Sequence, residues 1–157
     1  MVSLLDLMAT FAEVAGSDHR TEDSVNLIRF LKNPDGDPHK YLYWRSSPTR
    51  AIRDDRWKLL EYAKTSLSIE QLDAARRVSP PKDGWPRQAM EGYLTMLYDL
   101  KNDPGESTNL AKKYPEIVSR LQRAYDKWNK ELPEESILPA MRSTLIKIDG
   151  QTVQLIF

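Results

Sequence analysis

A group of arginines and aromatic residues between positions 43 and 57 is the part of this chain best suited to chemistry. Its members are Tyr43, Trp44, Arg45, Arg50, Arg53, Arg56 and Trp57. Guanidinium groups recognise sulfate or carboxylate through paired hydrogen bonds, and aromatic faces stack on sugars and cations. The group could therefore line the rim of an anionic sugar site. Strand alternation favours a second reading, which places Trp44 and Arg45 on opposite faces, with core aromatics and solvated arginines.

The histidines and carboxylates show no metal-binding or acid–base pattern. His19 and His39 are the only histidines, and twenty residues separate them, so they lack the i, i+4 spacing of a helical zinc site. We interpret both as loop residues. Paired carboxylates such as Asp54–Asp55 and Glu134–Glu135 fall in turn regions, where they are solvated or cap helices. The sequence therefore predicts no metal ligands.

Nucleophile and phosphate-binding motifs are also missing. The sequence has no cysteine, which excludes disulfides, thiol nucleophiles and Cys-ligated metals. No serine lies in a Gly-x-Ser-x-Gly elbow, and no glycine-rich phosphate loop occurs. We therefore expect neither a triad hydrolase nor a nucleotide-binding protein.

Length and charge further limit the classes of protein to which this chain could belong. The 157 residues are 40% hydrophobic, which suits one domain, residues 1–157. Lys and Arg total 23 and Asp and Glu total 23, so no charge excess favours nucleic acid. No apolar run reaches the roughly 18 residues of a membrane span, and the first residues do not resemble a signal peptide. We expect a soluble chain of undetermined compartment, whose parent protein could still be exported.

Hydrophobic periodicity predicts an α+β fold. Apolar residues at helical spacing run from Leu4 to Ala15 and stop at Gly16, which suits a helix C-cap. This apolar face is broad, so we expect the helix to pack between layers against something larger. Residues 24–31 read as a short second helix or turn. Together these segments form a helical lead-in over residues 1–33.

Residues 40–130 carry the pattern of a sheet with one covering helix. Four short strands are expected at 41–45, 51–53, 57–62 and 94–100, with connections that fit an antiparallel meander. An insertion is expected near 64–92. Pro115 suits the first turn of a long amphipathic helix that ends at Lys130 and packs on the sheet. In the tail, residues 131–157, Asp149-Gly150 between two alternating runs predicts a hairpin.

Five segments, in order, resemble the C-terminal subdomain of type I sulfatases in the alkaline-phosphatase-like superfamily. The first is Asp6–Gly16, which resembles the helix motif Asp-x-x-Pro/Ala-Thr-x-x-x-x-Ala-Gly. The others are Asp23–Leu31, Tyr41–Arg45, Arg50–Leu59 and Leu97–Ala111, which contains Asp103-Pro104-Gly105-Glu106 and Asn109. The Tyr-Trp-Arg strand looks most similar to arylsulfatases and N-acetylgalactosamine-6-sulfatases. The resemblance implies a four-stranded antiparallel sheet with a helix packed on it, in agreement with the periodicity.

The resemblance also implies what this chain lacks. A complete family member uses calcium and a formylglycine made from Cys or Ser in a Cys/Ser-x-Pro/Ala-x-Arg motif. This motif is absent, and Ser47-Pro48-Thr49-Arg50 has the wrong spacing. The family's calcium ligands and catalytic Lys and His pairs belong to its larger N-terminal domain. We therefore expect no catalytic residue and no cofactor in this chain, and its implied partner is the missing N-terminal sulfatase catalytic domain.

Three interpretations remain open. In the first, the chain is an inactive C-terminal fragment of a sulfuric ester hydrolase, with a structural role and with His39, Trp44, Arg45 or Arg50 at the substrate rim. In the second, it is a free-standing module that binds sulfated sugars. In the third, it completes a separately encoded catalytic subunit or self-associates through the first helix, because a large exposed apolar patch there would favour association.

Overall fold

The computed structural model describes residues 1–17, 23–32, 37–46, 49–64, 92–132, 143–148 and 150–156. His19, the expected insertion between 65 and 91, and the tail between 133 and 142 lie outside the described residues. The chain divides into two compact units. We call them the helical unit, Met1–Leu42 with the turn Arg53–Arg56, and the sheet unit, Tyr43–Ile52 with Trp57–Phe157.

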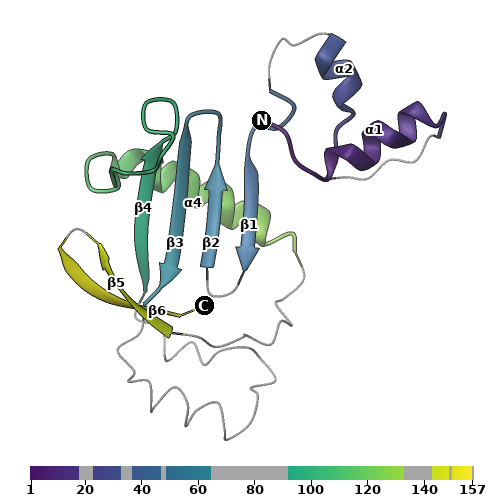
Figure 1. Ribbon diagram of the computed structural model, residues 1–157. Helices are drawn as coiled ribbons and strands as arrows, with labels where there is room; N and C mark the ends of the chain where they lie inside the picture. Colours follow the sequence, from purple (N-terminus) through teal and green to yellow (C-terminus); the bar gives the residue numbers. More distant parts are fainter. Residues whose placement is uncertain are drawn as a thin grey trace, which may run out of the picture. The chain divides into compact units, whose positions relative to one another are not determined.

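The helical unit contains α1, Asp6–Val14, and α2, Leu27–Lys32 (Figure 1). Helix α1 ends where expected, because Gly16 has φ 69° and Ser17 N donates to Ala12 O at 2.8 Å. A φ in this range suits glycine, which has no Cβ to clash with the backbone.

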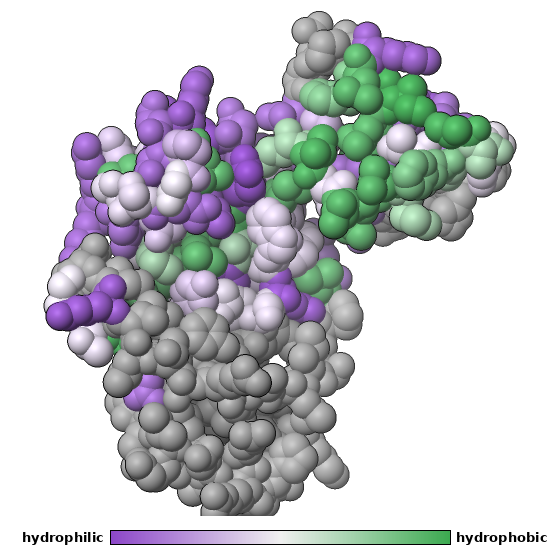
Figure 2. Space-filling model, in the orientation of Figure 1, coloured by the Kyte–Doolittle hydropathy of each residue, from purple (hydrophilic) through white to green (hydrophobic). Residues whose placement is uncertain are grey.

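The orientation of α1 reverses the usual distribution of polar and apolar groups. Its one buried residue is Asp6, with 0% exposure. Leu4 at 84%, Phe11 at 62% and Val14 at 70% are among the exposed apolar residues of this segment. Figure 2 shows hydrophobic residues gathered on the visible face of the helical unit. The helix is therefore held by polar contacts and leaves its apolar side uncovered by the described chain.

The sheet is a four-stranded antiparallel meander with strand order β1-β2-β3-β4, as predicted (Figure 1). Its strands are β1 Leu42–Ser46, β2 Thr49–Arg53, β3 Trp57–Ala63 and β4 Tyr93–Asp99. Between β2 and β3, Asp54 Oδ1 accepts from Arg56 N at 3.0 Å, which closes the predicted turn. In the β3–β4 pair, Trp57 opposes Asp99 and Ala63 opposes Tyr93, so the strands pair along their whole length.

Helix α4, Pro115–Asn129, lies across one face of this sheet (Figure 1). Along β3 every second residue from Trp57 to Ala63 is buried, which marks the side that faces α4. The largest fully buried side chains of the sheet unit are Ile52, Leu59, Leu97 and Leu121. Each such aliphatic side chain contributes about 1.5–3 kcal/mol by leaving water.

The C-terminal hairpin is also confirmed. Its strands are β5 Ser143–Ile148 and β6 Gln151–Ile156, paired antiparallel with Ile148 opposite Gln151. Gly150 in the connection has φ 77°, a conformation that a side chain would disfavour. Within the described ranges, no helix is long and apolar enough to cross a membrane.

Candidate functional site

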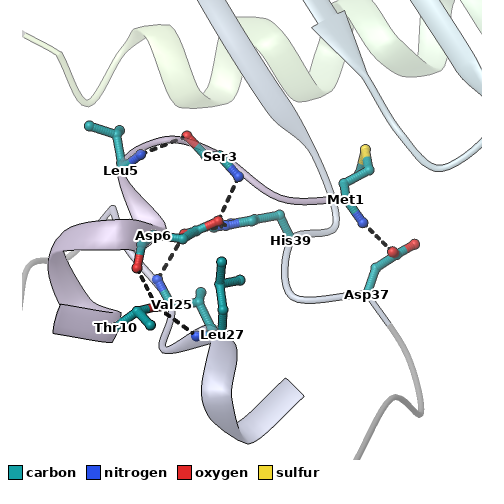
Figure 3. Close-up of polar contacts among 9 residues, drawn as sticks. All are labelled: Met1, Ser3, Leu5, Asp6, Thr10, Val25, Leu27, Asp37 and His39. Atoms are coloured by element: carbon teal, nitrogen blue, oxygen red, sulfur yellow. Dashed lines mark hydrogen bonds and ion pairs between the residues drawn. The ribbon is translucent and has the colours of Figure 1, made fainter. Parts of the chain in front are cut away.

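The buried Asp6 carboxylate is the centre of a polar cluster in the helical unit (Figure 3). Ser3 N donates to its Oδ2 at 2.6 Å, and Val25 N donates to its Oδ1 at 2.9 Å. His39 Nε2 lies 2.8 Å from Oδ1 and 3.0 Å from Oδ2. One carboxylate therefore joins the start of α1, the segment before α2 and the segment that leads into β1.

Thr10 repeats this arrangement one helical turn later. Its Oγ1 donates to Asp6 O at 2.6 Å and accepts from Leu27 N at 3.0 Å. Residues four apart lie on the same face of a helix. Asp6 and Thr10 thus hold the backbone N–H groups of Val25 and Leu27 together, which explains why the Asp and Thr of the sequence motif have this spacing.

Opposing influences act on the protonation of Asp6. Burial is the largest of them and raises the pKa of this carboxyl, because a charge is poorly solvated away from water. Hydrogen bonds from Ser3, Val25 and His39, together with the charge of His39, lower the pKa by more. The net result is a pKa below the ordinary value, so Asp6 is ionised at neutral pH.

The position of His39 fixes the role of each ring nitrogen. An ionised carboxylate can only accept hydrogen bonds, so Nε2 must carry the hydrogen that faces Asp6. The side chain is 16% exposed. Within the described ranges, the hydrogen bonds of the ring are those that Nε2 makes to the two oxygens of Asp6.

Arg50 belongs to a second polar network, which lies between the sheet and α4. Its Nε donates to Glu61 Oε2 at 2.7 Å, and its Nη1 lies 3.5 Å from Asp126 Oδ1. The guanidinium carbon is 4.3 Å from the ring centre of Tyr93 and 5.4 Å from that of Tyr125. The Glu61 carboxylate also accepts from Thr95 and Gln122, at 3.0 and 2.9 Å.

The two other rim candidates point to opposite faces of β1. Arg45 Nη1 donates to Asn129 Oδ1 of α4 at 3.1 Å. Tyr43, on the same side of the strand, stacks on Trp128 of α4 with ring centres 4.6 Å apart. Trp44 therefore points to the other face, where 49% of the residue is exposed. The alternation expected for Trp44 and Arg45 is correct, but the expected faces are reversed, because Arg45 contacts α4 and Trp44 is the exposed residue.

The loop between β4 and α4 carries the most specific sequence motif. Asn109 Oδ1 accepts from Leu97 N at 3.1 Å and Ala111 N at 3.0 Å, and Leu110 N donates to Leu97 O at 2.8 Å. These bonds occupy the outer edge of β4. Lys58 Nζ contacts both carboxylate oxygens of Glu106, at 2.7 and 2.9 Å. The motif residues thus hold the loop against the sheet.

A pocket of about 400 Å³ lies between β4, the loop before α4, the start of α4 and β6. Tyr93, Asn109, Lys112, Ser119 and Val153 are among its lining residues. The described residues contain no group of three His, Cys, Asp or Glu side chains that could hold a metal ion.

Comparison with known proteins assigns this arrangement to a family. The family model described as the C-terminal region of aryl-sulfatase matches residues 37–148. The chain belongs to this family. The match spans the four-stranded antiparallel sheet, α4 and β5.

Known relatives carry this region within longer chains. The ulvan-active sulfatase of Formosa agariphila is 26% identical in an alignment 147 residues long that covers 83% of this chain and 29% of that protein. A Bacteroides thetaiotaomicron chain from a core genetic locus for the metabolism of multiple glycosaminoglycans matches 80% of this chain and 24% of its own, with a TM-score of 0.51 and 22% identity. A 2-O GAG sulfatase matches 85% of this chain and 27% of its own, with a TM-score of 0.51 and 23% identity. These two structures support the fold alone.

Sequence reasoning identified His39 and Arg50 but missed Asp6 and Glu61, their partners. Asp6 was recognised only as a motif position, and it lies 33 residues from His39. Glu61 occupies an inward position in the alternation of β3. A carboxylate at such a position requires a partner, and this was the signal that could have identified Glu61.

Proposed function

We propose that this chain forms the C-terminal structural subdomain of a sulfuric ester hydrolase and docks on a separate catalytic portion that carries the nucleophile. The uncovered apolar side of α1 is the observation that supports the proposal. Leu4, Met8 and Phe11 are 84%, 59% and 62% exposed. An exposed patch of this kind marks a protein interface. The chain spans less than a third of the curated relative, so the rest of a sulfatase chain is the natural occupant.

The proposal assigns the cofactors to the catalytic portion. The sequence has no Cys/Ser-x-Pro/Ala-x-Arg motif from which formylglycine could form. The described residues offer no cluster of three acidic or histidine side chains for calcium. The proposal therefore places neither calcium nor formylglycine among the described residues, and it assigns no catalytic step to them.

The first test is activity of the purified chain. We expect no sulfate release from a chromogenic aryl sulfate in the presence of calcium, and no formylglycine by intact mass. Calcium-dependent turnover accompanied by a formylglycine mass would refute the claim that the chain is inactive alone.

The second test asks whether α1 docks. We would replace the matched region of the Formosa agariphila sulfatase with this chain and compare sulfate release with that of the truncated enzyme. Turnover should return in the chimera and disappear when Met8 and Phe11 are both changed to Glu. An Arg123→Glu chimera is the matched control, because Arg123 is exposed on α4. Equal activity of the Met8/Phe11 and Arg123 chimeras would contradict docking through α1.

Within this function we propose a rim role for His39, Trp44, Arg45 and Arg50. Trp44 is the strongest of the four, because an indole that is 49% exposed can stack on a sugar ring. His39, Arg45 and Arg50 already contact Asp6, Asn129 and Glu61, so a rim role would add to a structural one. In the active chimera, Trp44→Ala should raise KM, and an unchanged KM and kcat would remove Trp44 from the rim.

The exposed Trp44 also favours a second candidate function, a free-standing module that binds sulfated sugars. Saturable binding of the isolated chain to a sulfated glycan array, lost in Trp44→Ala, would support this function. Binding that survives the substitution would assign the sugar to another surface.

A further inference from the structure

β4 is the last strand of the four-stranded sheet, so its outer edge has no strand beside it in the described chain (Figure 1). In a strand, the N–H and C=O groups of every second residue point to the same edge. Leu97 presents its groups to the outer edge, because its N donates to Asn109 Oδ1 and its O accepts from Leu110 N. The pairing of β4 with β3 is uninterrupted, so Tyr93 and Thr95 also present their backbone groups to the outer edge.

The loop before α4 covers this edge in part. At Leu97 it supplies an acceptor and a donor, as a neighbouring strand would. Between Tyr93 and Leu97, the other bond that the described chain makes at the outer edge runs from Asn109 Nδ2 to Thr95 O, at 3.4 Å. The Thr95 N–H and both backbone groups of Tyr93 therefore lie on a stretch of edge that the described chain leaves open. Open strand edges are templates for pairing with another chain.

The pocket of about 400 Å³ lies beside this open stretch, because Tyr93, Leu94 and Thr95 are among the residues that line it. A volume in this range is typical of binding sites. The loop before α4, the start of α4 and β6 contribute apolar lining residues, which are Ala111, Pro115, Val118 and Val153. Among the described residues that line the pocket, Lys112 is the one with a charge, and it is exposed.

We propose that an extended peptide of another protein chain adds to the outer edge of β4 at Tyr93–Thr95, with an apolar side chain in the pocket and an acidic side chain near Lys112. A peptide strand carries donors and acceptors at the spacing of the open edge, and pockets beside the edge select its alternate side chains. The positive charge of Lys112 favours an acidic residue. This site involves none of the apolar residues of α1, so it does not depend on docking through that helix.

Hydrogen exchange in the full chain without peptide tests whether the edge is open. After correction for intrinsic rates, the amides of Tyr93 and Thr95 should exchange about fivefold to tenfold faster than the Leu97 amide, which bonds to Asn109. Equal protection of the three amides would show that the chain itself covers this edge, and it would overturn the proposal.

A synthetic peptide, acetyl-Thr-Glu-Val-Thr-Val-Glu-amide, tests the pairing. NMR titration should show saturable binding to the full chain, with increased protection of the Tyr93 and Thr95 amides. Two matched peptides carry N-methyl groups on alternate residues, one in each frame, so that each has lost the donors of one edge. One of them should lose binding and the other should keep it. Absence of binding by the parent peptide, or equal binding of the two methylated peptides, would overturn strand addition.

Lys112→Glu tests the predicted charge preference. The substitution should weaken binding of the same peptide about fivefold, the effect of losing an exposed ion pair. Lys113→Glu is the matched control, because Lys113 is also exposed but does not line the pocket, and its affinity should equal that of the unmodified chain. Equal affinities of the two variants would contradict the placement of an acidic side chain near Lys112.

Discussion

Arg50 and Glu61 form an ion pair across β2 and β3, with Arg50 Nε donating to Glu61 Oε2 at 2.7 Å. Glu61 is 3% exposed, and the side chain of Arg50 is 24% exposed. Removing one member of such a pair leaves an uncompensated charge away from water, which costs more than the pair itself contributes. Variants of this pair therefore test whether Arg50 stabilises the sheet unit.

Arg50→Met should lower the free energy of unfolding by about 3 kcal/mol, because Glu61 would keep its charge and lose its cation. Glu61→Gln combined with Arg50→Met should recover about half of that loss, because Thr95 and Gln122 could still donate to the glutamine oxygen. Urea unfolding followed by tryptophan fluorescence measures both values. Additive losses in the double variant would show that the two side chains do not couple.

Tyr43 and Trp44 are neighbours in β1 with opposite environments. Tyr43→Ala should destabilise the chain by about 2–3 kcal/mol, because it removes a ring stacked on Trp128 at 4.6 Å. Trp44→Ala should change the free energy of unfolding by less than about 1 kcal/mol, because the indole is 49% exposed. Thermal unfolding monitored by circular dichroism gives both values. Equal losses would mean that the Trp44 ring is covered in solution.

The elements of the sheet unit could be predicted because each has a local signal. Alternation marked β3 and β4, Asp54-Asp55 marked a turn, and Pro115 marked the start of α4. The sequence predicted less well which face of an element each side chain would occupy and which partner it would meet. Arg50 pairs with Glu61 on the side of α4, and Asp6 meets His39 across 33 positions. Such contacts depend on how separated segments meet, which periodicity does not encode.

Periodicity also did not show which side of α1 the rest of the chain would contact. The apolar residues of α1 correctly predicted a helix, and the prediction that this helix packs against something larger remains a prediction. In the structure the buried position is Asp6, and Leu4 and Phe11 are exposed. Periodicity identifies the apolar face of a helix, and the family match, over residues 37–148, begins after α1. Only the contacts of Asp6 and Thr10 with Val25 and Leu27 revealed which side of α1 the chain itself uses.

Asn109 protects the free edge of β4, and its replacement should cost stability. Asn109→Ala leaves Leu97 N and Ala111 N without the acceptor that now lies 3.1 and 3.0 Å away. We expect a loss of about 1–3 kcal/mol in the free energy of unfolding. Exposed strand edges also promote association between chains, so light scattering should show more aggregation. Ser119→Ala, at an exposed position of α4, is the control and should match the unmodified chain.

The lowered pKa of Asp6 predicts acid lability of the helical unit. A carboxyl whose pKa is lower in the folded state contributes stability above its unfolded pKa, and this contribution is lost as pH falls through the folded pKa. Protection of the Leu27 amide, which bonds to Thr10 beside Asp6, should therefore hold at pH 5 and decline as pH falls below the ordinary carboxyl pKa of about 3.9 and through the lower folded pKa of Asp6. Hydrogen exchange at Leu27 measures the loss.

Asp6→Asn provides the contrast for this acid transition. The asparagine should lower protection at Leu27 at pH 5 and remove the dependence on pH below it. Asp103 gives an internal comparison, because hydrogen bonds from the backbones of Ser107 and Thr108 also lower the pKa of its carboxyl. The Thr108 amide should thus lose protection in acid in the chain and in Asp6→Asn alike, whereas the Leu27 amide should do so only when Asp6 is present. An acid transition at Leu27 that survives Asp6→Asn would assign it to another carboxylate.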